Sequence, residues 1–595
     1  MKKQSITLLT AALLGQLITS VPAFAVDNLY GVGTRTDVPE RQIRQLQTQP
    51  ALAPVDKGEV TLPAMPEEHR SKQMPDGSTL NPQFVLTKIN FQGNTEISSR
   101  ELEVLAREIE GKEIYFSDLI DFTVKVSRYY QSKGYLTSYA FVPEQQIKGG
   151  VVTIKIFESR NIKPGISGHR WANEWFLRNI VMGKRGLREG DVFNSRPLQW
   201  ALKETNNDTT YIRTQTKVSK LKDTEETAVT LDVQDRFPLK LDLGVDNFGR
   251  DNTGRERFTA TLGSQNLTGY GDKIYGGTVL SENSTGVIAG YSVPLSPYGT
   301  RLGYDFSYSD AYPGGPLKYL DIKGTSISHF ISVTQPLVRT TKDDWTFKIG
   351  YDFFHTDSEI RLPPPVGGTL SDYNLRVLRT SFYGQHDDNS GRWFGNLGLD
   401  WGMDAFGASG KLPDGTTAEF TKFLAGAARV QKLPWNTIGI LRANGQYSGD
   451  KLYPAEKFQI GGAFNLRGYE PAILIGDYGV SGTAELRVPV PGLKQLMDAM
   501  GCPNVSDRVK LGAFYDFGWV DNHSSNYDYP KNYLHSVGAA IYTNLTEWIS
   551  AQAGFGVPLG TKYYDEGKIR FFFQVGTELD RLIPIQKKQK DLEIL

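Results

Sequence analysis

Arg467 lies in the stretch FQIGGAFNLRGYEPAILIGDYG, which contains five glycines and the triplet Arg-Gly-Tyr. A guanidinium group makes a geometrically selective contact with a carboxylate through two parallel hydrogen bonds. Asp516 in LGAFYDFGWV is a candidate partner. At the two-residue period of a strand it lies, with Phe514 and Gly518, on the face opposite the apolar residues, where a polar group can be met. Alternation alone leaves two interpretations open: either the two groups pair, or they are unrelated polar residues.

Other groups that could carry chemistry are sparse. The seven histidines are scattered, and the sequence holds no G-x-S-x-G motif and no histidine cluster at metal-ligand spacing. The segment GQHDDNSG at 384–391 is interpreted as a solvated loop rather than a catalytic triad. Cys502, the single cysteine, cannot form an internal disulfide. We therefore expect no catalytic residue, no metal site and no cofactor, which disfavours an enzyme.

The N-terminus has the features of an export signal. The charged start MKK precedes an apolar run that ends in A-F-A at 23–25, a pattern of small residues typical of a cleavage site. The run is short and is interrupted by Gln16, which disfavours a membrane anchor. Residues 1–25 are therefore predicted to be a signal peptide. No later apolar run reaches the roughly 18 residues of a membrane-spanning helix.

Residues 238–580 alternate between apolar and polar side chains in segments of about ten residues. One such face, in TRLGYDFSYSD, consists of Leu302, Tyr304, Phe306 and Tyr308. A soluble sandwich also alternates, but in an exported bacterial protein rich in glycine and tyrosine the pattern favours a transmembrane β-barrel. Its sheet must close, because lipid cannot satisfy an open edge. About 340 residues at about 21 per strand and loop predict about 16 antiparallel strands.

Two small α+β modules are predicted before the barrel, at 83–158 and 159–237. In the first, the strand pattern FVLTKINFQGN precedes a helix with Ser98 as N-cap and Glu101 at the capping-box position. A second helix between Ser117 and Gly134 and two further strands complete the module, and the same order recurs in the second. Repetition of a periplasmic module favours a docking arm over a catalytic domain.

The segment 26–48 predicts a helix with few apolar residues. In DVPERQIRQLQTQP only Val38, Ile43 and Leu46 are apolar. A helix that is polar on nearly every side has no core to join, so it is either frayed in water or housed in a polar cavity. Residues 49–82 follow with frequent prolines and no clear periodicity, which predicts an extended linker.

Several motifs make the chain similar to a known family. They include LGVDNFGRDNTGRERF, NLTGYGDKI, GYSVPL with GTRLGYDFSYS, and TQPLVRT; the most specific are EKFQIGGAFNLRGYEPAILIGDYGVSGTAEL and LGAFYDFGWV. Over essentially the whole mature chain, the protein resembles the outer-membrane transporters of two-partner secretion, the TpsB branch of the Omp85 superfamily. The resemblance implies a sixteen-stranded barrel, two POTRA modules and an N-terminal plug helix. It also implies export of one large partner protein without ATP.

The resemblance assigns roles to the two motifs that hold Arg467 and Asp516. It implies that the sixth extracellular loop folds back into the barrel, where Arg467 meets Asp516 and locks the loop to the wall. The remaining motif residues are Leu466, Gly468 and Tyr469 in the loop and Phe514 and Gly518 in the strand. Because the lumen of so wide a barrel is wet, we expect a solvent-exposed pair worth about 1 kcal/mol.

The sequence departs from the family pattern in two places. Leu466 stands where the loop motif more often has valine. The chain also ends in DRLIPIQKKQKDLEIL rather than in the aromatic residue usual on the last strand. Residues 581–595 are either a periplasmic extension, or Leu579 takes the place of that terminal residue.

The expected partner is a large secreted protein, such as an adhesin, a cytolysin or a contact-dependent toxin. The POTRA modules are expected to bind it by adding a strand at an open sheet edge. Outer-membrane lipid and, during biogenesis, the barrel-assembly machinery are further expected partners, and a monomer is expected. The formal net charge of zero gives no indication of nucleic-acid binding. Two alternatives remain open: a barrel-assembly insertase, which would usually carry more modules, and a gated porin or receptor, which would need no periplasmic modules.

Overall fold

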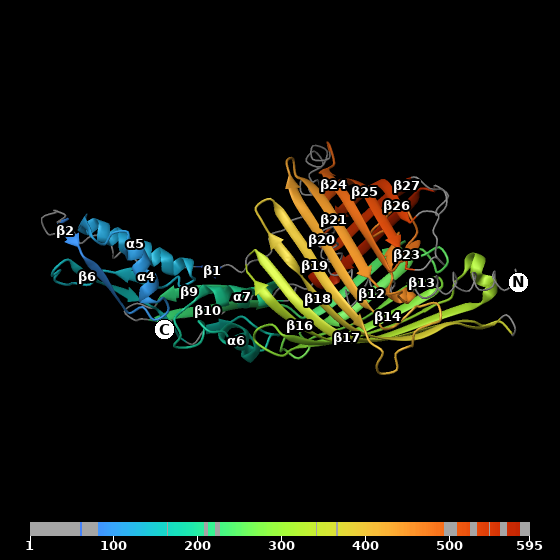
Figure 1. Ribbon diagram of the computed structural model, residues 1–595, viewed down its shortest axis with the longest axis horizontal. Helices are drawn as coiled ribbons and strands as arrows, with labels where there is room; N and C mark the ends of the chain where they lie inside the picture. Colours follow the sequence, from blue (N-terminus) through green and yellow to red (C-terminus); the bar gives the residue numbers. More distant parts are fainter. Residues whose placement is uncertain are drawn as a thin grey trace. The chain divides into compact units, whose positions relative to one another are not determined.

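The structure is a computed structural model in which the chain divides into two compact units, formed mainly by Phe237–Pro584 and by Asp56–Arg236 (Figure 1). It describes residues 60–61, 81–162, 165–207, 212–220, 226–340, 342–363, 367–492, 508–523, 532–546, 548–559 and 568–582. The predicted signal peptide (1–25), the plug segment with Val38, Ile43 and Leu46, and most of the predicted linker and C-terminal extension lie outside these residues.

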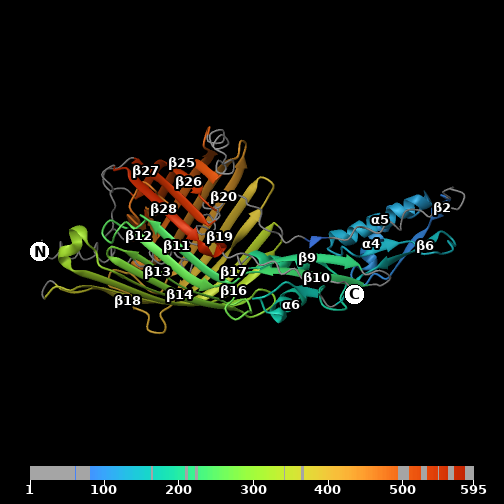
Figure 2. The same cartoon turned by 180° about the vertical axis from the view of Figure 1, so that it is seen from behind.

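Sixteen antiparallel strands form a closed barrel (Figure 2), which confirms the predicted architecture. The strands are β11 (Leu239–Asp246), β12 (Arg257–Ser264), β13 (Lys273–Ser281), β14 (Ser284–Pro294), β15 (Arg301–Ala311), β16 (Ile322–Arg339), β17 (Asp343–Ile360), β18 (Gly368–Asp387), β19 (Gly391–Gly402), β20 (Thr421–Leu433), β21 (Thr437–Ser448), β24 (Tyr478–Pro489), β25 (Val509–Asp521), β26 (Tyr533–Asn544), β27 (Ile549–Leu559) and β28 (Arg570–Glu578). Each strand pairs with its neighbour in the chain order, and β28 pairs with β11 to close the sheet. The short 3-10 helices η2 (Gly315–Leu320) and η6 (Leu579–Leu582) also lie outside the strands.

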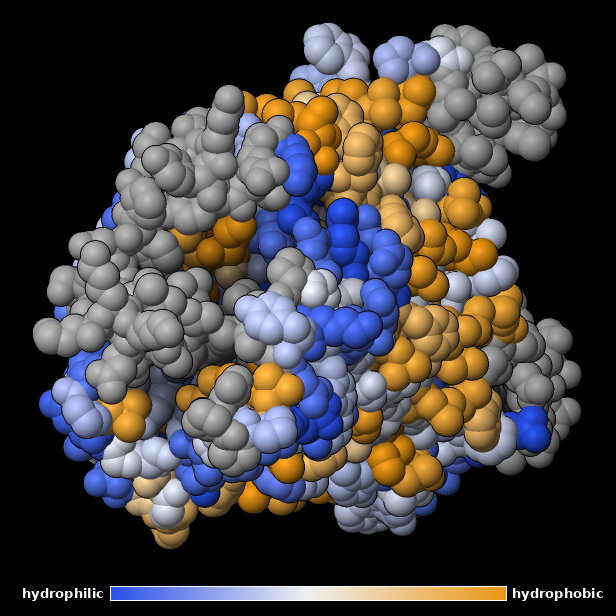
Figure 3. Space-filling view, turned by 90° about the vertical axis from the view of Figure 1, so that its right-hand side faces the viewer, coloured by the Kyte–Doolittle hydropathy of each residue, from blue (hydrophilic) through white to orange (hydrophobic). Residues whose placement is uncertain are grey.

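Apolar side chains face outward from the barrel and polar ones face its interior. Along β25, Leu511, Tyr515 and Phe517 are exposed, whereas the alternate residues Phe514 and Asp516 are buried. Figure 3 shows apolar residues along the right-hand side of one face, with hydrophilic residues gathered toward its centre. The outer apolar band is the surface that a transmembrane barrel presents to lipid.

The first module contains two helices packed against short strands. Its elements are β2 (Gln83–Leu86), β3 (Lys88–Gln92), α4 (Ser99–Ala106), β4 (Lys112–Tyr115), α5 (Phe116–Ser132), β5 (Tyr139–Phe141) and β6 (Val151–Phe157). Ser98 caps α4 as predicted, since its Oγ accepts the Glu101 N–H at 3.3 Å. The Glu101 carboxylate turns instead to Tyr129 and Lys133, so the predicted capping box is only half formed. The short strand β4 was not predicted, because Ile114 is its only buried residue.

The second module repeats the arrangement. Its elements are β7 (Arg160–Asn161), β8 (Gly165–Ser167), α6 (Glu174–Met182), α7 (Ser195–Asn207), β9 (Ile212–Lys220) and β10 (Glu226–Asp235). The two helices pack on the β9–β10 sheet through a continuous apolar core that includes Leu177, Leu198 and Leu231. Among the described residues, no helix is long and apolar enough to cross a membrane.

The sheet edges of both modules are partly covered by other segments of the chain. The short strand β1 (Val60–Thr61) pairs in parallel with the outer edge of β9. The Ala140 N–H of β5 donates to Ser127 Oγ at 2.9 Å, and the Ile89 N–H of β3 donates to Glu110 Oε1 at 2.8 Å. Proteins commonly protect edge strands from unwanted pairing in this way. The expectation of open edges was therefore wrong at these positions, because the covering groups come from elsewhere in the chain.

Candidate functional site

The loop between β21 and β24 folds into a compact structure that packs against the barrel wall. It contains η3 (Pro454–Glu456) and a two-stranded sheet of β22 (Phe458–Ile460) and β23 (Leu474–Gly476). Leu466 and Tyr469, at the tip of the loop, are almost fully buried and form an apolar cluster with Val520 and Leu534 of the barrel. This packing places the loop motif against β25 and β26.

Arg467 at the loop tip makes a bidentate ion pair with Asp516 of β25. Its Nε donates to Asp516 Oδ2 and its Nη2 to Asp516 Oδ1, both at 2.9 Å. The Arg467 backbone N–H adds a third hydrogen bond to Oδ2 at 3.1 Å. The Phe514 ring lies under the guanidinium, 3.3 Å from its carbon to the ring centroid. These contacts fix both the side chain and the backbone of the loop tip.

The ion pair belongs to a larger buried cluster of four charges. Arg467 Nη1 also donates to Glu485 Oε2 of β24 at 2.6 Å, and Arg487 Nε donates to Glu485 Oε1 at 2.6 Å. We call Arg467, Arg487, Glu485 and Asp516 the loop lock. Its side chains are between 0% and 7% exposed, so the expectation of a solvent-exposed pair was wrong. The cluster is electrically balanced, with two cations and two anions.

The sequence motifs did not single out Glu485 or Arg487. Alternation in VSGTAELRVPV places both on the polar face of β24, as it does other residues on that strand. Nothing in the pattern distinguishes a polar residue that contacts the loop tip from one that faces water. The fold of the loop decides that Glu485 and Arg487 belong to the site, because it places the loop tip beside Glu485 on the barrel wall.

Two further loop residues fit tightly against β26 and β27. The Tyr469 hydroxyl lies 3.2 Å from His535 O and 3.3 Å from Leu559 O. The Gly468 N–H donates to Ser536 Oγ at 3.3 Å. A Cβ added at Gly468 would lie 2.7 Å from Ser536 Cβ, closer than real side chains approach. Glycine is therefore required for this close approach of the loop to the wall.

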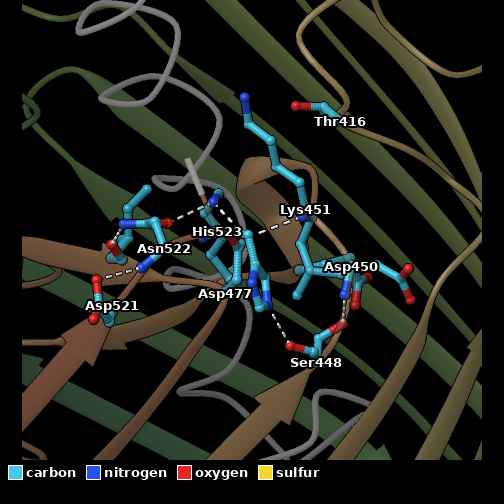
Figure 4. A network of polar contacts seen from close by, with 12 residues as sticks. Thr416, Ser448, Asp450, Lys451, Asp477, Asp521, Asn522 and His523 are labelled. Atoms are coloured by element: carbon cyan, nitrogen blue, oxygen red, sulfur yellow. Dashed lines mark hydrogen bonds and ion pairs between the residues drawn. The ribbon is translucent and has the colours of Figure 1, made fainter. Parts of the chain in front are cut away.

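Asp477 joins the two ends of the loop (Figure 4). Its Oδ1 accepts the Leu452 N–H at 2.9 Å and Lys457 Nζ at 2.5 Å. Its Oδ2 accepts the backbone N–H of His523 at 3.0 Å, and His523 Nε2 lies 2.7 Å from Ser448 O. The base of the loop is thus closed on itself and tied to the segment that follows β25.

Residues 225–544, more than half of the chain, match the family described as haemolysin secretion/activation protein ShlB/FhaC/HecB. The chain belongs to this family. Residues 84–159 match the POTRA domain of the ShlB type. Members of the ShlB/FhaC/HecB family are transporters of the TpsB type that act with large secreted partner proteins, rather than enzymes. The barrel accordingly lies in the outer membrane, with the POTRA modules in the periplasm.

Individual relatives of the ShlB/FhaC/HecB type resemble the chain along most of its length. It is 25% identical over 505 residues to the outer membrane transporter CdiB of Dickeya dadantii, covering 81% of this chain and 84% of the relative. It is 24% identical over 476 residues to the heme/hemopexin transporter protein HuxB of Haemophilus influenzae, covering 77% and 80%. The solved structure of CdiB from Escherichia coli shares the fold, with a TM-score of 0.72 and 22% identity over 91% of this chain and 97% of that one.

Proposed function

We propose that this protein exports one large partner protein across the outer membrane without ATP. The POTRA modules capture the partner in the periplasm, and the barrel is its conduit. The observation that carries the proposal is the loop lock, which holds an extracellular loop against the inner wall of the barrel by four buried charges. A closed barrel of about 16 strands is wide enough to leave an aqueous channel. The partner belongs to the class of adhesins, cytolysins or contact-dependent toxins.

Reconstitution tests the proposed export directly. The purified transporter is placed in proteoliposomes with its cognate partner outside and with no nucleotide present. We expect the partner to become protected from added protease inside the vesicles. Vesicles that hold the same amount of a transporter without residues 84–236 serve as the control. Protection that appears only after ATP is added would contradict export without ATP, and equal protection in the control would contradict capture by the modules.

Residues 26–48 are proposed to plug the pore at rest, which extends the sequence prediction for a segment outside the described residues. Deleting 26–48 is expected to raise single-channel conductance in planar bilayers, because a helix about 10 Å wide would leave the lumen. Secretion of the partner should largely survive, since capture and conduit are unchanged. The full-length protein in the same bilayer is the reference. Unchanged conductance would remove this segment from the pore.

The POTRA modules are proposed to bind the N-terminal region of the partner by strand addition. Pairing of β1 with β9 occupies one edge of the second module. A purified fragment 84–236, which lacks β1, is therefore expected to bind the partner region at about micromolar strength. The fragment 56–236, which retains β1, should bind more weakly.

Titration calorimetry measures both affinities, and circular dichroism shows that both fragments are folded. No detectable binding by either folded fragment would contradict capture by the modules. Equal binding by both fragments would contradict the use of the β9 edge.

A further inference from the structure

The segment Leu452–Glu456, which precedes the loop tip, contacts a different part of the barrel from the loop lock. Leu452 and Tyr453 are almost fully buried in an apolar cluster with Ala418 and Phe420. The Tyr453 ring stacks on the Tyr373 ring of β18, with 4.4 Å between the centroids. We call Leu452, Tyr453 and Glu456 the loop shoulder. Its apolar part alone gives the loop a second region of contact with the wall.

Glu456 adds a charged contact beneath this apolar cluster. Its Oε2 accepts Lys422 Nζ of β20 at 2.5 Å, and its Oε1 accepts Arg379 Nη2 of β18 at 3.1 Å. Lys422 Nζ also donates to the Glu456 backbone carbonyl at 3.0 Å, and Gln446 Nε2 of β21 donates to the same carbonyl at 2.9 Å. Both the side chain and the backbone of Glu456 are therefore held by the wall.

The cations that bind Glu456 are built into the wall. Lys422 is 1% exposed, although the next residue of β20, Phe423, is 54% exposed on the outer face. Arg379 in turn donates to Asp352 of β17, and its Nη1 lies 3.6 Å from Asp400 Oδ2 of β19. Strands β18, β20 and β21 thus each place one polar side chain on Glu456, and acids of β17 and β19 hold Arg379 in turn. Buried charges are tolerated only when they are paired, and Glu456 supplies the carboxylate that pairs with the buried Lys422.

The loop lock and the loop shoulder contact separate strands of the barrel. The acids of the loop lock lie on β24 and β25, whereas Glu456 contacts β18, β20 and β21. Between the shoulder and the tip, Gly461 and Gly462 have φ angles of 112° and 94°, in the left-handed region that favours glycine. We propose that Glu456 is a second anchor of the loop, which holds the shoulder against the barrel independently of Arg467. When the lock opens, the tip leaves the wall while the shoulder stays.

Cysteine labelling on intact cells tests this second anchor without any need for the secreted partner. The reporter is Ala418→Cys in a chain with Cys502→Ala, because Ala418 is 1% exposed and packs in the cluster that contains Leu452 and Tyr453. A membrane-impermeant maleimide should label this parent slowly. Glu456→Lys, which faces Arg379 and Lys422, should raise the labelling rate at least about tenfold, and Glu456→Gln should raise it less.

Three further variants make the result specific. Arg467→Ala should leave the labelling rate within about twofold of the parent, since sites that contact different partners act independently. Glu419→Gln, at an exposed glutamate beside the reporter, should also leave it unchanged. Combining Glu456→Lys with Lys422→Glu should restore slow labelling, because the charges again attract. Heat-modifiable migration in gels establishes that each barrel is folded.

Continued protection of the reporter in folded Glu456→Lys and Glu456→Gln would overturn the proposal. So would an increase in Arg467→Ala as large as that in Glu456→Lys, because the loop would then have one anchor only. If Glu456→Lys does not fold, two other variants test whether Glu456 anchors the shoulder. They are Glu456→Gln and the double variant Glu456→Lys with Lys422→Glu. Failure of export in reconstituted vesicles would not affect these outcomes, so the two proposals can fail separately.

Discussion

Replacement of Arg467 by alanine is expected to lower secretion of the partner at least about tenfold, while the barrel still inserts into the outer membrane. The change leaves Asp516 and Glu485 buried with Arg487 as the only remaining cation of the loop lock. Breaking a buried pair on one side typically costs about 3–5 kcal/mol, which exceeds the roughly 1 kcal/mol of an exposed pair. The loop tip should therefore detach, because detachment lets water reach the unpaired carboxylates.

The double variant Arg467→Ala with Asp516→Ala should be no worse than either single variant. Removing both residues leaves Glu485 paired with Arg487 at 2.6 Å, so the cluster is again neutral. Residues that act as one unit give non-additive losses. Secretion is measured at matched membrane levels, together with the temperature at which the folded band disappears from gels. Losses that simply add would show that Arg467 and Asp516 act separately.

Arg361→Ala provides a matched control for this experiment. Arg361 pairs with Asp321 at 2.6 Å in the same barrel, but the two side chains are 41% and 49% exposed. An exposed pair contributes about 0–1 kcal/mol, so this variant should secrete normally and melt at nearly the same temperature as the parent. A loss comparable to that of Arg467→Ala would show that burial is not the reason for the effect.

Alanine at Gly556 is expected to disable the loop lock without changing any charge. A Cβ added at Gly556 of β27 would lie 2.5 Å from the carbonyl carbon and oxygen of Arg467 and 2.6 Å from the Gly468 nitrogen. Backbone atoms cannot rotate away as a flexible side chain can, so the loop tip must move off the wall. We expect a secretion loss similar to that of Arg467→Ala in a barrel that still inserts.

Gly576→Ala on the neighbouring strand β28 separates this steric effect from the general cost of changing a strand glycine. The atom nearest to its new Cβ would be Ser550 Oγ at 3.7 Å, an ordinary van der Waals contact. This variant should secrete at the parental level. Normal secretion by Gly556→Ala would mean that the loop tip tolerates displacement and that its close packing has no functional role.

The sequence predicted the barrel because lipid imposes a strict rule on strands. Alternate residues must be apolar where they face hydrocarbon, as at Leu511, Tyr515 and Phe517, and the sheet must close because no edge can remain unpaired. Alternation acts locally along the chain, so it can be read from residue order, and closure then follows because hydrocarbon leaves an unpaired edge unsatisfied. The N-cap Ser98 is a similarly local feature, since its hydroxyl binds a backbone group only three residues away.

The composition of the site depended on tertiary structure. Arg467 and Asp516 were singled out by their motifs, but Glu485 and Arg487 look in sequence like any other polar residues of an inward face. The same holds for Glu456, whose partners Arg379, Lys422 and Gln446 lie on three different strands.

By itself, then, the sequence determined the closed barrel, the inward face of the strands that alternate clearly and the two motifs that single out Arg467 and Asp516. Alternation states which side of the wall a residue occupies, but not whether that side is wet. The loop fold decided that the four charges of the lock are buried, because Leu466 and Tyr469 pack against the wall beside them and exclude water. That exclusion turns an ordinary lumenal pair into a contact that is costly to break on one side.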